Sequence, residues 1–165
     1  MNRFFVIMLR FALAGAVLIG LFGQIIVIPS TAAREVENFP PYEPFAAPYV
    51  TVAILGVACV QTVLIAGFML LGAVGRDALF AQESFRWVDA VIGATIAATL
   101  LALGVCVHLG VADIPSPADG MELIGAMGGA IVCVGAGASF TIFMVVMRNL
   151  LRKATDLKAE MAEVI

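Results

Sequence analysis

One stretch near the C-terminus decides the fold of this chain: LIGAMGGAIVCVGAGASFTIFMVVM, residues 123–147. It contains no charged residue, and it exceeds the roughly 20 apolar residues that a helix needs to cross a hydrocarbon core of about 30 Å. It passes directly into a charged segment, RNLLRKATDLKAEMAEVI (residues 148–165), without a proline or glycine at the junction. We therefore expect one continuous helix that crosses a membrane and then projects from it.

Three further apolar runs have a comparable length, so the chain contains four in all. Hydrophobic residues make up 62% of the chain and charged residues 13%, whereas a soluble domain is about a quarter charged. The runs lack the alternation of apolar and polar residues that membrane β-barrels require, and their connections are too short for a second domain. We predict an all-α fold, a four-helix transmembrane bundle that forms one domain over residues 1–165, with spans at about 4–28, 49–74, 88–111 and 121–147 and a tail at 148–165.

The distribution of basic residues predicts the orientation of the spans. Eight of the nine Lys and Arg residues fall in the N-terminus, the central loop and the tail, and Arg34 alone falls in the other two loops. Because cytoplasmic segments are enriched in Lys and Arg, we expect both termini and the central loop in the cytoplasm, with the protein in the inner (plasma) membrane. The opposite side is acidic, with Glu35, Glu37, Glu43, Asp113, Asp119 and Glu122.

A cleaved signal peptide is the alternative interpretation of the first run. Residues Ser30-Thr31-Ala32 resemble a small-residue cleavage site, but the apolar part of a signal peptide covers only about 7–15 residues. The first run is longer and includes Arg10, so we expect it to be retained as a span.

The loop between the first two spans is rich in proline. Five of the seven prolines lie between Pro29 and Pro48, and each removes a backbone donor and disfavours helical geometry just before it. We therefore expect an extended strap, with its rings at the membrane interface. This strap is either a simple tether or an outward site for a ligand or partner.

Small residues recur every four positions in the fourth run, at Gly125, Gly129, Cys133, Gly137 and Thr141. Such stripes allow two membrane helices to approach closely. We expect this face to be the one on which the bundle, or a dimer, closes.

The sequence excludes most familiar chemistry. It has a single histidine, His108, and three cysteines, each in a different apolar run and none in a Cys-x-x-Cys pair. It lacks the His-Glu-x-x-His motif of metalloproteases, and no charged residue lies at mid-depth, where coupled transporters keep one. We expect no enzyme activity, no cofactor and no metal.

The tail has an apolar seam with spacing 4, 3, 4, 3, formed by Leu150, Ala154, Leu157, Met161 and Val164. This is the pattern of a coiled-coil helix, and it would project about 27 Å at 1.5 Å per residue. Two heptads need a partner, which could be a second copy, the central loop, the headgroups or another protein. The candidate interaction residues are Leu150, Arg152, Lys153, Leu157 and Met161 in the tail and Phe80, Glu83, Ser84 and Arg86 in the central loop.

Two motifs carry a resemblance to a known family. They are Leu79-Phe80 followed by Glu83-Ser84-x-Arg86, and the run Leu150-Leu151-Arg152-Lys153-Ala154-Thr155-x-Leu157-x-x-Glu160. With the span count, they resemble the bacterial YoaS-like family of small four-span membrane proteins, a domain of unknown function. In that family the stretch after Phe-x-x-Glu-Ser is more basic, whereas Trp87-Val88-Asp89 stand here. The resemblance implies a small helix-turn-helix regulator as cytoplasmic partner, by analogy alone.

These observations favour a non-enzymatic membrane protein, a regulatory or interaction subunit that acts through its tail and central loop. Its partners would be the lipid bilayer, a cytoplasmic protein or a second copy, without direct binding of nucleic acid. The alternative is a lipophile-binding or transport-related module, with a lateral cavity under the aromatic outer loop.

Overall fold

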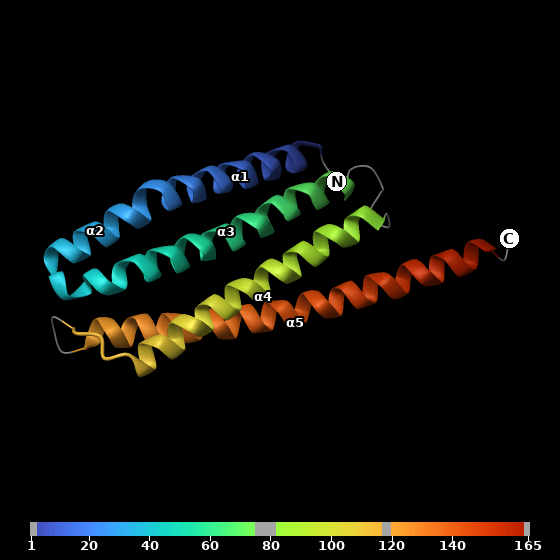
Figure 1. The fold of residues 1–165 in the computed structure, drawn as a ribbon. Coiled ribbons are helices and arrows are strands. Elements are labelled where there is room, and N and C mark those ends of the chain that lie inside the picture. The colour runs from blue at the N-terminus through green and yellow to red at the C-terminus, as the bar shows by residue number, and fades with distance from the viewer. Residues whose placement is uncertain (1–2, 75–81, 117–119, 164–165) are drawn as a thin grey trace.

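A computed structural model describes the backbone of residues 3–74, 82–116 and 120–163, and the side chains of residues 4–72, 85–116 and 120–157 (Figure 1). Helices account for nearly all of this part of the chain. They are α1 (Arg3–Phe22), the π-helical turn η1 (Gly23–Val27), α2 (Ile28–Asn38), the short 3-10 helix η2 (Pro40–Tyr42), α3 (Glu43–Val74), α4 (Gln82–Val111) and α5 (Met121–Glu163).

Four helical segments are long and apolar enough to cross a membrane, which confirms the predicted all-α fold with four spans. By length and composition they are Phe4–Asn38, Pro40–Gly72, Phe85–Val111 and Met121–Leu157. The predicted continuous C-terminal helix is also present, because α5 runs for 43 residues without a break. Four such helices indicate a multi-pass membrane protein.

The expectation of an extended strap between the first two spans was wrong. The chain continues from α1 through η1 into α2 and reverses only at Phe39, whose backbone is extended (φ −142°, ψ 88°). Pro29 and Pro44 lie in the first turns of α2 and α3, where a helix does not need their missing N–H groups. In the π-helical turn before Pro29, the Ile28 N–H donates to the Gly23 carbonyl, five residues back. Pro44 therefore lies at the start of a helix, whereas Pro29 follows the π-helical turn within a continuous helical segment and Pro48 lies inside α3.

The helices form an open row and not a closed bundle (Figure 1). Along the row, α1 packs on α3, α3 on α4, and α4 on α5, while α2 packs on the start of α3. Among the described residues, α1 shares no backbone contact with α4 or α5, and α3 shares none with α5. The predicted four-helix bundle is therefore correct in its helices, but it has no enclosed centre.

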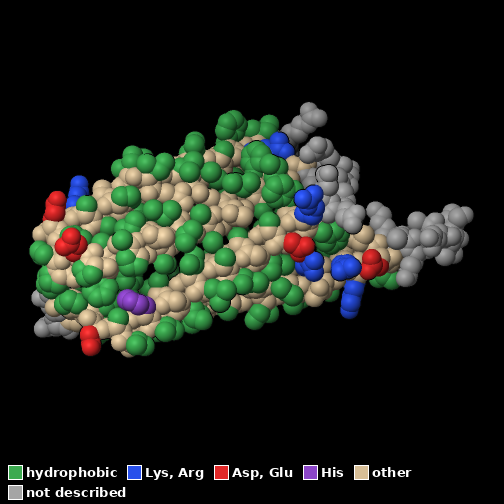
Figure 2. Space-filling model, in the orientation of Figure 1, with side chains coloured by type: hydrophobic (Ala, Val, Ile, Leu, Met, Phe, Trp, Pro, Cys, Tyr) green, Lys and Arg blue, Asp and Glu red, His purple; other side chains and the backbone are tan. Residues whose placement is uncertain are grey.

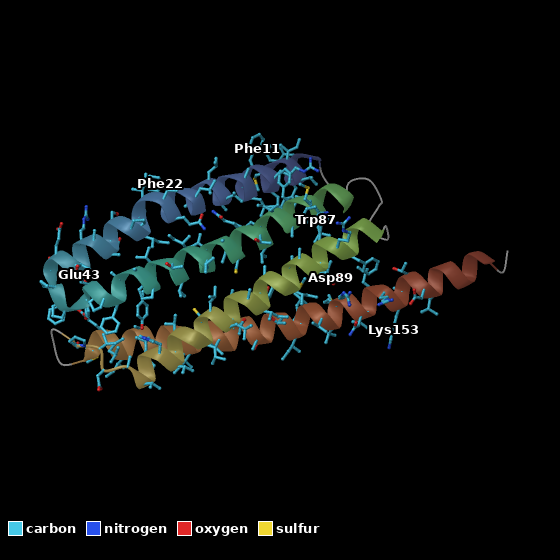
Figure 3. All side chains as sticks on the ribbon, viewed as in Figure 1. Phe11, Phe22, Glu43, Trp87, Asp89 and Lys153 are labelled. Carbon is cyan, nitrogen blue, oxygen red and sulfur yellow. The ribbon has the colours of Figure 1, made fainter. Side chains whose placement is uncertain are left out.

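The buried core is correspondingly small and follows α4. It consists of Ala66, Val88, Val91, Ala94, Thr95, Leu109 and Ala130. Large apolar side chains such as Phe11 and Phe22 on α1 point away from α3 (Figure 3) and are more than half exposed. In a bilayer these side chains would meet lipid, which leaves the packing between helices to small residues and polar contacts.

Two glutamines and one arginine join the first span to α3. Gln24 donates to the Ile54 carbonyl (3.0 Å), and Gln61 donates to the Val17 carbonyl (3.4 Å). The Arg10 guanidinium lies 5.5 Å from the centre of the Phe68 ring, within the range of a cation–π contact. The glutamine contacts satisfy amide groups that would otherwise face hydrocarbon, whereas the Arg10 Nε is buried without a hydrogen-bond partner among the described residues.

The glycine stripe of α5 closes on another helix at one position. A Cβ at Gly137 would lie 3.3 Å from the Thr99 Cβ on α4 and closer still to the Thr99 hydroxyl, whereas a Cβ at Gly125 or Gly129 would meet nothing within 4 Å. The prediction of a close-approach face therefore holds at Gly137, where α4 and α5 cross.

Both chain ends lie at the same end of the row, and α5 extends there beyond the start of α4 (Figure 1). We call this the tail end, and we call the opposite end, with α2, η2 and the turn before α5, the hairpin end. The basic side chains gather mainly at the tail end, where acidic side chains lie among them, while the hairpin end carries acidic side chains, one basic side chain and the histidine (Figure 2).

Candidate functional site

An ion pair fixes the base of the tail. Arg148 of α5 donates from Nη2 to Oδ2 of Asp89 on α4 (3.0 Å), and its Nε lies against Oδ1 of the same carboxylate. Figure 3 shows Asp89 on the side of α4 that faces α5. Two parallel contacts of this kind restrict geometry as well as attract. The pair therefore sets the direction in which α5 leaves α4.

This ion pair was not predicted. The predicted third span begins at residue 88, but α4 begins at Gln82, so Asp89 lies about two turns into the helix. The sequence did contain a signal, because an acidic residue near the start of one span and a basic residue at the end of the next must lie at the same level when the two helices are antiparallel.

A groove of about 500 Å³ opens beside the ion pair, between the start of α4 and the tail segment of α5. Its lining combines three arginines, two aspartates, a threonine and a ring: Phe85, Arg86, Asp89, Arg148, Arg152, Thr155 and Asp156. Two predicted interaction residues, Arg86 from the central region and Arg152 from the tail, thus meet in one groove. The side chains available here suit polar and ionic contacts.

The predicted apolar seam of the tail lies on a different face of α5. At about 100° per residue, Leu150 and Leu157 project roughly opposite to Arg148 and Thr155, which face the groove. Both leucines are more than half exposed, at 56% and 59%. Ala154 and Lys153 are exposed as well. In the part of the chain whose side chains are described, the seam is left uncovered.

The remaining predicted residues are only partly described. Glu83 and Ser84 lie in the first turn of α4, and Met161 lies near the end of α5, but their side chains are outside the described residues. Phe80 falls outside the described residues altogether.

At the hairpin end, aromatic side chains of α3 pack against the histidine of α4. The Tyr49 hydroxyl lies 2.9 Å from Nδ1 of His108 in a hydrogen bond, and the two rings pack edge to face with centres 5.7 Å apart. The ring of Phe45 contacts His108 in the same way, at 6.2 Å. These contacts hold one face of α3 against the end of α4.

A second contact at the hairpin end joins η2 to α5. The Tyr42 hydroxyl donates to Oε2 of Glu122 over 3.4 Å, and the Tyr42 ring packs edge to face on Phe39 at 4.8 Å. Because α3 and α5 share no backbone contact, this bond spans the gap that they leave at the hairpin end.

A pocket of about 280 Å³, partly open to its surroundings, fills that gap. Its walls come from α2, η2 and α3, the end of α4 with the following turn, and the start of α5. The lining residues are Ala32, Tyr42, Phe45, Ala46, Tyr49, Val50, Leu109, Ile114, Pro115, Ser116, Glu122, Leu123 and Ala126. The rings that were expected to lie at the membrane interface therefore line a pocket between helices.

The sequence suggested a lateral cavity under the aromatic outer loop only as part of the alternative, without its lining residues, because the region was interpreted as an extended strap. The signal was the spacing: Tyr42, Phe45 and Tyr49 are separated by three and four residues, which places them on one face of a helix. No group of three or more His, Cys, Asp or Glu residues that could hold a metal occurs in the described part of the chain.

The comparisons with known proteins place the chain in a family. The family DUF2975, described as a protein of unknown function, matches residues 30–165. The match covers most of the chain, from α2 to the end of the tail, so the chain belongs to this family, which confirms the predicted membership of a family of unknown function. No curated protein and no solved structure matches the chain.

Proposed function

We propose that this member of the DUF2975 family is a non-enzymatic protein of the bacterial plasma membrane that acts on a partner protein through its tail end. Both termini and the central loop face the cytoplasm in this proposal. The support is the distribution of charge, because eight of nine Lys and Arg residues belong to the tail end by sequence and such residues stay on the cytoplasmic side.

The uncovered seam of α5 carries the proposal. Leu150 and Leu157 are exposed, and their spacing is that of core positions, which a coiled-coil helix buries against a partner. Burying a leucine fully contributes about 1.5–3 kcal/mol, so covering the two leucines can drive association with a helix of similar pattern. The amphipathic tail is the surface that this partner would cover.

The base of the tail is suited to presenting that surface. The Arg148–Asp89 pair joins α5 to α4 beside the groove, and α5 continues past them to Glu163. Because the ionic groove and the apolar seam lie on opposite faces, a partner can cover the seam without disturbing the ion pair. The proposed candidate residues are Leu150, Lys153, Leu157 and Met161 on the tail.

The kind of partner is proposed from the YoaS-like resemblance. That resemblance favours a small helix-turn-helix regulator in the cytoplasm, held at the membrane by a helix that packs on the seam. A second copy of the chain is the other occupant that the heptad pattern allows.

Affinity capture of the full chain at native expression tests the proposal. The variant Leu150→Ser with Leu157→Ser keeps the length of the tail but removes the apolar seam. The control, Asn149→Ser with Thr155→Ser, changes two tail residues outside the seam. We expect the seam variant to lose its partner and the control to retain it, and equal capture by both would contradict the proposal. Coexpression of two differently tagged copies shows whether the lost partner is the chain itself.

A further inference from the structure

The pocket at the hairpin end has a wall of aromatic rings. Tyr42, Phe45 and Tyr49 all line it from the same face of η2 and α3, and contacts with neighbouring residues fix their positions. The Tyr42 ring packs on Phe39, and the rings of Phe45 and Tyr49 pack on His108. Aromatic rings carry negative potential on their faces and attract cations there.

One carboxylate belongs to the opposite wall. Glu122, from the first turn of α5, is the charged residue among those that line the pocket, and no lysine or arginine is among them. Its Oε2 accepts the hydrogen bond from Tyr42, which keeps the carboxylate at the edge of the aromatic wall. A positive group in the pocket would therefore lie near a carboxylate and three aromatic rings.

The charges around the pocket are mostly negative, like that of Glu122. Among the described residues, the hairpin end carries five carboxylates, at Glu35, Glu37, Glu43, Asp113 and Glu122, and one arginine, Arg34. Such a surface raises the local concentration of cations and lowers that of anions. An anionic or acidic ligand is thus disfavoured both by the surroundings and by Glu122.

Apart from Ser116, the rest of the lining is apolar. Leu109, Leu123 and Ala126 extend the pocket along α4 and α5, toward the part of the row that faces hydrocarbon. A volume of about 280 Å³ lies near the lower limit of ligand pockets, so it suits a small polar head with a short part of an alkyl chain.

From this geometry we propose that the pocket binds a hydrophobic ammonium ion, an amine or quaternary ammonium group that carries an alkyl chain. The ammonium group lies between Glu122 and the rings of Tyr42, Phe45 and Tyr49, and the chain lies along Leu109 and Leu123. This inference does not depend on the partner proposed for the tail. It gives the lipophile-binding alternative a definite site and ligand class.

Binding of a small probe to the full chain in dodecyl maltoside tests the proposal. The probe is hexyltrimethylammonium, hexanol is its uncharged counterpart, and calorimetry or ligand-observed NMR measures the dissociation constant. We expect the cation to bind at least about tenfold more tightly than hexanol, since the carboxylate attracts the positive charge and the aromatic rings favour a cation over an alcohol. Equal affinities, or no binding of the cation, would overturn the proposal.

Matched variants identify the site. Glu122→Gln should weaken binding of the cation about tenfold, because the amide carries no charge, and leave hexanol unaffected, whereas Glu43→Gln, at an exposed residue outside the pocket lining, should change neither. Phe45→Leu keeps an apolar side chain but removes a ring, so it should weaken the cation selectively. Unchanged affinity for the cation in Glu122→Gln would overturn the assignment even if Phe45→Leu failed to fold.

Competition distinguishes two sources of the ammonium group. Short-chain phosphatidylethanolamine should displace the probe if a lipid headgroup is the natural occupant, and a free amine is indicated if the probe is displaced by alkylamines alone. Displacement by phosphatidylglycerol as effective as that by phosphatidylethanolamine would contradict an ammonium site.

Discussion

Gly137 of α5 lies so close to Thr99 of α4 that a methyl group at position 137 would overlap the threonine hydroxyl. The Thr99 hydroxyl donates to the Thr95 carbonyl one turn earlier (2.8 Å), so moving the side chain aside would break that bond. This close approach lies within the contact between α4 and α5, which is the most extensive helix contact of the row.

The first prediction concerns this crossing. We expect Gly137→Ala to destabilise the protein by about 1–3 kcal/mol, the usual cost of overpacking, measured by unfolding in mixed micelles. Gly129→Ala is the control, because it adds the same methyl group on the same helix where nothing lies within 4 Å. The double variant Gly137→Ala with Thr99→Ala should recover part of the loss. Equal effects at positions 137 and 129 would show that the crossing is not close.

The second prediction concerns the ion pair at the base of the tail. Both side chains are partly exposed, at 33% for Arg148 and 49% for Asp89, so Asp89→Asn should reduce stability by no more than about 1 kcal/mol. The loss should shrink at high salt, because screening already weakens the pair there. Unfolding at low and high ionic strength checks this. A salt-independent loss of several kcal/mol would mean that Asp89 has another structural role.

The third prediction concerns the tyrosine and histidine at the hairpin end. Tyr49→Phe removes the hydroxyl that is hydrogen-bonded to His108 and retains the ring contact, so we expect a loss of about 0.5–1.5 kcal/mol. The ring nitrogen signals of His108 in an NMR spectrum should shift as well. Tyr42→Phe, which removes a hydroxyl bonded to Glu122 instead, should leave those signals unchanged. A His108 spectrum that is identical in Tyr49→Phe and the wild type would contradict the contact.

The fourth prediction concerns orientation. After Cys59, Cys106 and Cys133 are replaced by alanine, single cysteines are introduced by Glu37→Cys and Lys153→Cys. A membrane-impermeant maleimide should label position 37 in intact cells and position 153 only after permeabilisation, because the basic end stays inside. The reverse pattern would invert the proposed topology.

The spans were predictable because they depend on local composition. A run such as residues 123–147 has no stable environment other than hydrocarbon, and its junction with the tail lacks any helix breaker, so the continuity of α5 followed from the sequence. The prediction of an extended strap from the prolines was wrong for a related reason. A proline terminates a helix or begins one according to its position, and the sequence does not show that Pro29 and Pro44 lie in first turns.

Pairings between helices were not predictable in the same way. The Arg148–Asp89 contact and the Tyr42–Glu122 contact join residues that are 59 and 80 positions apart, and each depends on the order of helices in the row. The open row itself depends on which small-residue faces pack against another helix. Of the α5 glycines in the predicted stripe, Gly137 meets α4 closely, while Gly125 and Gly129 present the same pattern to open space.

Because α5 is a single long helix, its close approach to α4 at Gly137 lies far from both of its ends. Among the described helices, α5 shares backbone contacts with α4 alone, and Gly137 lies near the middle of this continuous helix. Glu122 lies about 22 Å from the crossing on one side and Leu157 about 30 Å on the other, at 1.5 Å per residue. One continuous helix therefore links the carboxylate at the hairpin end to the apolar seam at the tail end.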